Sequence, residues 1–403
     1  MKLPIWATGL LVTTGIQMAG SFMSQSLPVV APLLTTATGV GREQAGTMYA
    51  LYMAGSILFL AAGTPLIARF GPLRTMRIGL VCGTGALALV AIGIWPVVIG
   101  ASLLLGLAYG PCPPGTTRVL AATAPPRHRA LIFSIKQSGA QVGGVFAGLF
   151  IAPVAAHYGW EAGLLLPIGL GVATAIAVGP AGQALSVARD PPKPLSWSAM
   201  FGVPALRAPF AAVAASPGLM GMTLVTTSLA VAQACLFSFC VTWLVTVQHM
   251  SLPRAGMVYA CMQAGGTLGR IAVGWTADRS QNVPRDLGLQ CWVSAALVAG
   301  WAFLPIGAGL GIVIPLAFAI GVAAASWPGL ILSETSRLAP PGRIADAAAG
   351  SSMITFLGYV FGPLLFSLGV RQCESWVAPY LAVAGLVAAT AAAVSWRLAR
   401  QGR

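Results

Sequence analysis

Apolar runs of about 18 or more residues, each long enough to cross a lipid bilayer as a helix, follow one another along most of this chain. Only 7% of the residues are charged and 57% are hydrophobic, so a soluble fold would lack polar residues to cover its surface. The sequence therefore predicts an all-α integral membrane protein. The runs predict twelve transmembrane helices, at residues 5–34, 44–67, 76–94, 97–122, 131–156, 162–183, 218–247, 254–277, 287–305, 310–336, 348–370 and 377–398.

A more polar stretch separates the first six predicted spans from the last six. We therefore divide the chain into a six-helix bundle at 1–183, a cytoplasmic linker at 184–216 and a second six-helix bundle at 217–403.

The two halves repeat. A shift of 215 residues lays Gly106 on Gly321 and Pro113 on Pro328, and the sequence LVTT recurs at a shift of 213. A parallel duplication of this kind predicts two pseudo-symmetric bundles, with a substrate site between them near the bilayer midplane.

The net charge of +14 suits a nucleic-acid partner in a soluble chain, but basic residues also gather in the cytoplasmic loops of membrane proteins. Placing the N-terminus in the cytoplasm leaves only Arg42, Arg254 and Arg371 outside. This bias predicts that both termini are cytoplasmic and requires no nucleic acid. Short loops and an Ala-rich composition favour the inner membrane of a bacterium. Sixteen basic residues then lie inside: Lys2, Arg69, Arg74, Arg77, Arg127, Arg129, Arg189, Lys193, Arg207, Arg279, Arg285, Arg337, Arg343, Arg397, Arg400 and Arg403.

Two related motifs lie at the predicted cytoplasmic face. Residues 274–279 read Gly-Trp-Thr-Ala-Asp-Arg, and a first-half copy at 64–74 keeps Arg69, Gly71 and Arg74 but has Ala68 where an Asp is usual. They resemble the Gly-x-Leu-Ala-Asp-Arg-x-Gly-like loop of the major facilitator superfamily, and the resemblance covers essentially the whole chain. It implies the fold of that superfamily and transport by alternating access.

The resemblance also implies a cytoplasmic gate. Residues 333–337 resemble the Glu-x-x-Arg element of the family's gate network, and fixed charges at helix ends can hold one conformation and release it in another. The alternative is ordinary loop charge without a gating role. We assign to the gate Arg69, Arg74, Arg118, Asp278, Arg279, Glu334 and Arg337.

Three cations, Arg118, Lys136 and Arg270, fall inside predicted spans, whereas no Asp or Glu lies deep in one. An ionisable side chain in a membrane is costly and is therefore a candidate for function. Arg270, four residues before Gly274, resembles the Arg-x-x-x-Gly of monocarboxylate and oxalate-type members, whose eighth-helix Arg binds the substrate carboxylate. A guanidinium can donate two parallel hydrogen bonds to a carboxylate. The alternatives are an Arg270 braced against helix-end carbonyls and a Lys136 that reaches the cytoplasmic surface.

Uncharged polar residues on apolar spans complete the candidate binding site. Gln17, Ser21 and Ser24 follow one another at i, i+4 and i+7 and share one face of the first helix. Such a stripe turns away from lipid, either to line a cavity or to bond neighbouring helices. The other candidates, which join Arg270 and Lys136, are Gln137, Tyr109, Gln233, Gln263 and Tyr359.

A positive cavity prefers anions, so we expect a monomeric secondary transporter of a small organic anion, most simply a carboxylate. The alternative is an exporter of amphipathic drugs or metabolites by proton antiport. It is weakened because Ser102 stands where the family's antiporters carry an Arg in the fourth helix. The three His residues are widely separated and no CxxC pair occurs, so we expect no catalytic residues, no metal and no cofactor.

Overall fold

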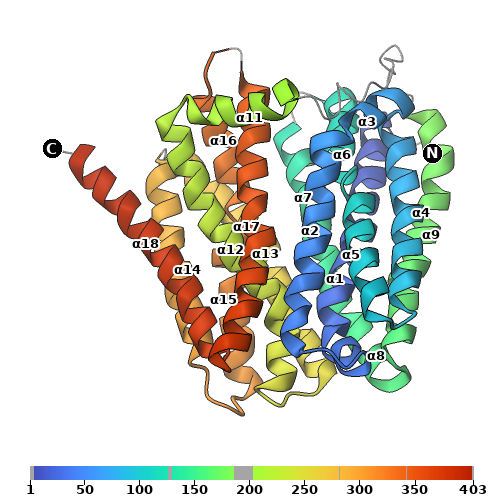
Figure 1. Ribbon diagram of the computed structural model, residues 1–403. Coiled ribbons are helices and arrows are strands. Elements are labelled where there is room, and N and C mark those ends of the chain that lie inside the picture. The colour runs from blue at the N-terminus through green and yellow to red at the C-terminus, as the bar shows by residue number, and fades with distance from the viewer. Residues whose placement is uncertain (1–3, 126–128, 186–202, 281, 342, 402–403) are drawn as a thin grey trace. The chain divides into compact units, whose positions relative to one another are not determined.

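The computed structural model describes residues 4–125, 129–185, 203–280, 282–341 and 343–401. The described residues form helices joined by short loops and contain no strand, which confirms the all-α prediction (Figure 1). They fall into two compact units. The first is Met1–Arg42 with Leu51–Gly202, and the second is Glu43–Ala50 with Val203–Arg403.

The helices of the first unit follow the six predicted spans, three of which are divided into shorter pieces. They are α1 (Ile5–Ala37), the larger part of α2 (Ala45–Ala62), α3 (Thr64–Phe70), α4 (Pro72–Val90), α5 (Trp95–Tyr109), α6 (Cys112–Thr123), α7 (Arg129–Phe146), the π-helical turn η3 (Ala147–Ile151), α8 (Ala152–Tyr158) and α9 (Trp160–Ala184).

The second unit has the same order of long helices and one additional short helix. Its helices are α11 (Val203–Ala214), α12 (Pro217–Thr246), α13 (Leu252–Ser280), α14 (Val283–Ala302), α15 (Leu310–Ala325), α16 (Pro328–Leu338), α17 (Ile344–Cys373) and α18 (Val377–Gln401). The 3-10 turn η1 (Arg42–Gln44) precedes α2.

Nine segments of the described chain are long and apolar enough to cross a membrane. The other three predicted spans coincide with α1, α13 and α14, whose 33, 29 and 20 residues are long enough for a bilayer but include more polar side chains. The number twelve therefore stays a prediction. The nine segments are Arg42–Ala62, Pro72–Val90, Trp95–Thr123, Ile135–Tyr158, Trp160–Pro180, Pro217–Thr246, Leu310–Ile331, Asp346–Cys373 and Val377–Arg397.

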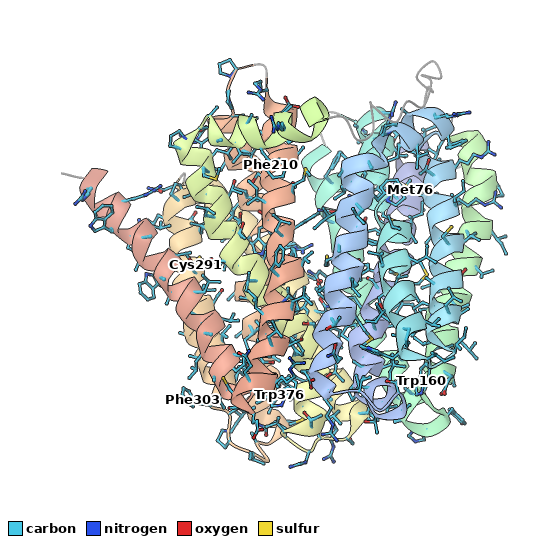
Figure 2. All side chains as sticks on the ribbon, viewed as in Figure 1. Met76, Trp160, Phe210, Cys291, Phe303 and Trp376 are labelled. Carbon is cyan, nitrogen blue, oxygen red and sulfur yellow. The ribbon has the colours of Figure 1, made fainter. Side chains whose placement is uncertain are left out.

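Large apolar side chains lie on the outside of both units. Met76 in α4 and Cys291 in α14 are fully buried, but Phe303, Leu165 and Ile312 are each more than 60% exposed (Figure 2). So much exposed apolar surface is unusual for a water-soluble monomer. It is the surface expected of helices that face lipid.

The fourth and tenth predicted spans are each broken at the same place in the repeat. The first break lies between α5 and α6 at Gly110 and Pro111, and the second between α15 and α16 at Ser326 and Trp327. Each following helix has prolines within its first turn, and a proline lacks the N–H that would continue the preceding helix.

Glycines bring α2 and α5 together in the first unit. A Cβ on Gly106 would collide with the carbonyl oxygen of Tyr52, and a Cβ on Gly55 would collide with that of Leu103. The Ser56 hydroxyl, one residue further along α2, donates to the carbonyl of Gly106 at 3.2 Å. Only glycine allows the two backbones to approach this closely.

The second unit repeats this contact between α13 and α15. A Cβ on Gly321 would meet the carbonyl oxygen of Met262, and a Cβ on Gly265 would meet that of Phe318. The α13 residues lie 210 positions after their counterparts in α2, and the α15 residues lie 215 after those in α5. The predicted duplication is therefore confirmed at the level of backbone packing.

Part of the predicted linker at 184–216 is an ordered helix. In α11, Ala212 and Val213 are fully buried with Leu219 and Ala347, and Gly350 of α17 admits the carbonyl of Pro209. Figure 1 shows α11 running across the end of the second unit, at a steep angle to α17. Residues 186–202 of the predicted linker lie outside the described residues.

The start of α2 packs with the second unit. The Ser367 hydroxyl in α17 lies 2.7 Å from the carbonyl oxygen of Glu43 and 2.9 Å from that of Pro363. Gly46 faces the ring of Phe239 and the carbonyl of Pro363, with no room for a Cβ. Residues Glu43–Ala50 are thus held by α12 and α17.

We predict that Gly321→Ala and Gly106→Ala each lower the free energy of unfolding by about 1–3 kcal/mol, because the new methyl group displaces a backbone carbonyl. Thermal unfolding of the purified protein in detergent measures the change. Matched controls on the same helices are Gly311→Ala and Gly100→Ala, where no atom lies within 4 Å of the new Cβ. These controls should stabilise slightly, since Ala favours helix. Equal melting temperatures for all four variants would contradict the prediction.

Candidate functional site

Arg270 lies in α13 and contacts the end of α15. Its Nε donates to the carbonyl oxygen of Ala325, the last residue of α15, at 3.0 Å. The carbonyls at a helix C-terminus carry partial negative charge, so a cation is favourable there. The bracing contact considered from the sequence is thus present. A guanidinium has five N–H donors, and this bond uses the one on Nε.

Beside Arg270, three buried side chains from different helices meet. The Gln233 oxygen in α12 accepts hydrogen bonds from the Trp327 indole N–H at 3.1 Å and from the Tyr359 hydroxyl at 2.8 Å. The two aromatic rings lie 6.4 Å apart between centroids. Arg270 is near enough to interact electrostatically with Tyr359. The structure therefore gathers three of the predicted residues, Arg270, Gln233 and Tyr359, into one group. We call these three residues and Trp327 the Arg270 cluster.

Gln263 makes a separate bond on α13. Its Nε2 donates to the Tyr259 hydroxyl at 2.9 Å, and its oxygen has no partner among the described residues. Gln263 lies seven residues before Arg270, so both are on the same face of the helix.

Lys136 is the candidate cation of the first unit. Its side chain is only 2% exposed, so it does not lie at the protein surface. Its ammonium group donates to the Gln137 oxygen at 3.0 Å, and the Cys112 thiol of α6 is near enough to interact electrostatically. Among the described residues no carboxylate pairs with Lys136.

The polar stripe of α1 is buried and makes hydrogen bonds between helices. Gln17 Nε2 donates to the Tyr109 hydroxyl at 2.5 Å, and the Ser21 hydroxyl donates to the carbonyl of Ala140 in α7. Ser24 bonds back to the carbonyl of Ser21 at 3.0 Å. These bonds fit the packing alternative for the two serines. Gln17 differs, because its buried oxygen has no partner among the described residues.

Sequence reasoning missed two members of these groups, Trp327 and Cys112. They occupy equivalent positions in the repeat, each directly before a proline in the first turn of the next helix. The signal was available, because a proline inside an apolar run marks a helix break.

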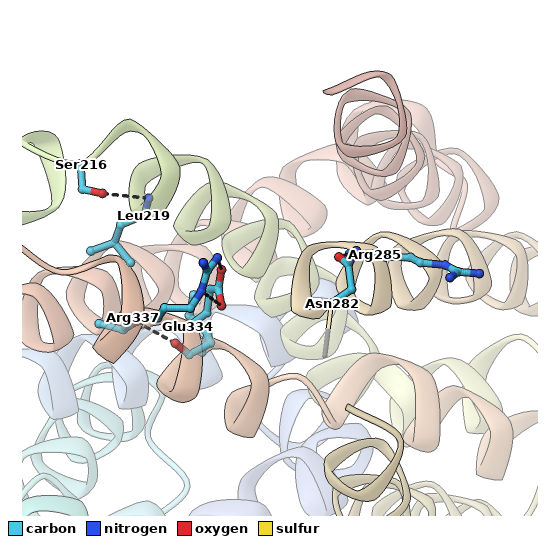
Figure 3. A network of polar contacts seen from close by, with 8 residues as sticks. Ser216, Leu219, Asn282, Arg285, Glu334 and Arg337 are labelled. Atoms are coloured by element: carbon cyan, nitrogen blue, oxygen red, sulfur yellow. Dashed lines mark hydrogen bonds and ion pairs between the residues drawn. The ribbon is translucent and has the colours of Figure 1, made fainter. Parts of the chain in front are cut away.

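Glu334 and Arg337 form an ion pair on α16 (Figure 3). Arg337 Nε lies 3.0 Å from one carboxylate oxygen of Glu334, and Nη2 contacts the other. Glu334 is 3% exposed, whereas the Arg337 side chain is largely exposed. The hydrogen bond that Arg337 donates to Glu334 raises the pKa of Arg337, so the guanidinium stays charged. The sequence placed both residues in the gate, and the structure joins them.

The other gate candidates make different contacts. Arg69 and Arg74 are exposed and both lie near the Phe70 ring, with guanidinium carbons 5.6 and 5.8 Å from its centroid. The Arg279 guanidinium lies over the Trp275 ring at 3.6 Å. Arg118 is half-buried in α6. The side chain of Asp278 lies outside the described residues.

The described part of the chain contains no group of three or more His, Cys, Asp or Glu side chains that could hold a metal ion.

Known proteins resemble this chain along most of its length. It is 27% identical over 293 residues to an uncharacterized MFS-type transporter of Mycobacterium tuberculosis H37Rv, a match that covers 72% of this chain and 63% of the relative. It is 24% identical to the 4-hydroxybenzoate transporter PcaK of Pseudomonas putida, over 73% of this chain and 70% of PcaK. A gallate transporter of Pseudomonas putida is 27% identical, over 62% of this chain and 61% of that protein. The chain thus matches less than two thirds of the length of the first relative and of the gallate transporter.

Solved structures share the fold. A bacterial homologue of the human lysosomal transporter Spinster, in an inward-facing and occupied conformation, superimposes with a TM-score of 0.76 at 16% identity, covering 98% of this chain and 97% of that one. The peptide transporter POT in complex with sulfate gives a TM-score of 0.79 at 14% identity, covering 97% and 94%. At these identities the likeness concerns the fold alone.

The sequence profile of the Major Facilitator Superfamily matches residues 10–363, which is most of the chain and spans both helical units. The chain therefore belongs to the Major Facilitator Superfamily of membrane transporters.

Proposed function

We propose that this transporter moves small organic carboxylates, aromatic acids among them, across a bacterial inner membrane by alternating access. It acts as a monomer with both termini in the cytoplasm, and Arg270 binds the substrate carboxylate. The observation that carries the proposal is the Arg270 cluster, where a fixed guanidinium lies beside a buried amide and two aromatic rings.

The relatives support the carboxylate class. Two of them are named for transport of 4-hydroxybenzoate and of gallate, and both compounds are aromatic rings that carry a carboxylate. A guanidinium held by a backbone carbonyl through Nε keeps its plane fixed, which favours paired hydrogen bonds to a planar anion.

The balance of charge supports an anion as well. Lys136 is buried among neutral groups, and a buried cation without a countercharge is costly in a membrane protein. An anionic substrate supplies that countercharge when it binds. Lys136 with its hydrogen-bond partner Gln137, together with the Gln17–Tyr109 pair of the same unit, is therefore a second candidate binding group.

The gate is part of the same proposal. The Glu334–Arg337 pair lies in the last turns of α16, the helix whose N-cap residue is Trp327 of the Arg270 cluster. A rigid helix of eleven residues connects the two groups, so a change at Trp327 can reach the ion pair.

The first prediction from the proposed function concerns Arg270. Arg270→Lys should lower uptake of 4-hydroxybenzoate into proteoliposomes at least about tenfold, because a lysine cannot donate two parallel hydrogen bonds from one plane. The matched control is Arg254→Lys, which changes an exposed arginine on the same helix and should retain uptake. Melting temperatures show that each variant is folded. Undiminished uptake by Arg270→Lys and Arg270→Ala would leave Arg270 with the bracing role alone.

The purified protein can also be used to distinguish a carboxylate transporter from the alternative, an exporter of amphipathic drugs or metabolites. Thermal stabilisation is measured with a panel of benzoates, aliphatic carboxylates and cationic or neutral amphipathic drugs. Stabilisation by the drugs and by no carboxylate would overturn the proposed substrate class.

The second prediction concerns Lys136. Lys136→Met should keep or raise the melting temperature of the ligand-free protein, because an apolar side chain of similar length replaces a buried charge. It should also reduce the stabilisation given by carboxylates. Arg77→Met, which removes an exposed charge from α4 of the same unit, should leave that stabilisation unchanged. A full carboxylate response in Lys136→Met would exclude Lys136 from anion binding.

The third prediction concerns the gate. Arg337→Ala should lower the free energy of unfolding by about 1.5–3 kcal/mol, because it leaves the buried Glu334 carboxylate without its partner. The double change Glu334→Gln with Arg337→Ala should cost less than the single change. Asp346→Asn is the control, since its pair with Arg343 at 3.6 Å is half-exposed and contributes about 0–1 kcal/mol.

The gating role has its own readout. Glu334→Gln should change the ratio of cytoplasmic to periplasmic labelling of single introduced cysteines. An unchanged ratio, with the expected loss of stability in Arg337→Ala, would show that the pair is structural only.

A further inference from the structure

The amide of Gln233 is fixed in one orientation by its two neighbours. The Trp327 indole nitrogen can only donate, so the Gln233 atom that faces it at 3.1 Å must be the oxygen. The Tyr359 hydroxyl donates to the same oxygen at 2.8 Å. A carbonyl oxygen has two lone pairs, and both are used. The Nε2 group therefore points away from both rings with its two N–H donors.

These donors have no partner among the described residues, although Gln233 is only 5% exposed. A membrane interior offers few acceptors, so an unpaired amide N–H is unfavourable there. Two other buried glutamines show the opposite arrangement. Gln17 and Gln263 use their nitrogen on a tyrosine hydroxyl and leave their oxygen unpaired. Gln233 differs from these two in presenting donors, which suit an oxygen atom of a ligand.

The surroundings of Gln233 suit an aromatic ligand. Trp327 and Tyr359 lie on one side of the amide with their rings inclined by 34°, and Phe356 packs against Tyr359 at 5.9 Å. Arg270 donates to the carbonyl of Ala325, two residues before Trp327, so the cation lies at the same helix break as the indole that bonds to the Gln233 amide. Such a group can hold a carboxylate, a ring and one further oxygen atom.

We propose that Gln233 determines specificity for aromatic acids that carry a ring oxygen, by donating from Nε2 to that oxygen. Trp327 and Tyr359 are positioning residues that hold the amide in the donating orientation. The inference rests on the proposed function, in that Arg270 binds the carboxylate of the same substrate. A ligand that lacks the ring oxygen leaves the Gln233 donors unpaired, and such a mismatch is what makes a polar site selective.

The experiment compares the binding of benzoate, 3-hydroxybenzoate and 4-hydroxybenzoate to the purified full-length protein by calorimetry. The wild-type protein should bind the better hydroxybenzoate about tenfold more tightly than benzoate, as expected for one hydrogen bond to an otherwise unpaired donor. Gln233→Met should bring this ratio close to one while benzoate binding changes little. The control is Gln290→Met, a buried glutamine of α14 whose nitrogen donates to the carbonyl of Ala323 at 2.7 Å. It should keep the wild-type ratio.

Tyr359→Phe provides a second test that keeps the aromatic wall. It removes one of the two donors that fix the Gln233 oxygen, so the ratio of hydroxybenzoate to benzoate affinity should fall part of the way toward one. This test remains available if Gln233→Met does not fold. A merely structural role for Tyr359 would weaken all three ligands equally and leave the ratio unchanged.

Three outcomes overturn the inference. Equal binding of benzoate and both hydroxybenzoates by the wild-type protein, with binding still dependent on Arg270, overturns the role of Gln233 and leaves the proposed function standing. A ratio of hydroxybenzoate to benzoate affinity that is unchanged in folded Gln233→Met and Tyr359→Phe does the same. If none of the three acids binds, the inference fails together with the aromatic-acid part of the proposed function.

Discussion

Polar groups in this protein must find partners within the protein, because the hydrocarbon of a bilayer offers none. Most hydroxyl groups meet this constraint locally. Thr13 donates to the carbonyl of Gly9 at 2.7 Å, and Ser102 donates to that of Val98 at 2.8 Å, each one turn back on its own helix. Such residues are polar in sequence but are already satisfied.

Other hydroxyl groups join helices of one unit. Thr223 in α12 pairs with Ser351 in α17 at 2.9 Å, and Ser228 pairs with Thr390 in α18 at 2.8 Å. Bonds of this kind contribute modestly to helix association. After these local and interhelical bonds are set aside, few buried polar atoms remain to bind a ligand. Lys136 and the amide of Gln233 are the informative ones, because one carries charge and the other presents donors.

The sequence predicted the helices well because the apolar runs are long. The seventh predicted span, 218–247, is α12 at Pro217–Thr246. It missed α11, since twelve residues are too short to be taken for a membrane span. It also treated 310–336 as one helix, although Pro328 begins a new one. For the site, sequence placed Gln233, Arg270 and Tyr359 on three separate spans. Trp327 contacts both Gln233 and Tyr359 because of tertiary packing. The spacing of residues along one helix does not predict such a contact.

The break in the tenth span connects the bracing of Arg270 with the carboxylate binding that we propose for it. The break ends α15 at Ala325, whose carbonyl accepts from Arg270, and it places Trp327 where its indole donates to Gln233. In the first unit, Leu60 corresponds to Arg270 by the shift of 210 residues, and Cys112 corresponds to Trp327 by the shift of 215. The packing glycines are the same in both halves, but the polar residues at the break differ, and the cation near Cys112 comes from α7 instead. The two units thus share a backbone contact and not a set of polar residues, so the carboxylate contact that we propose for Arg270 has no counterpart at the break of the first unit.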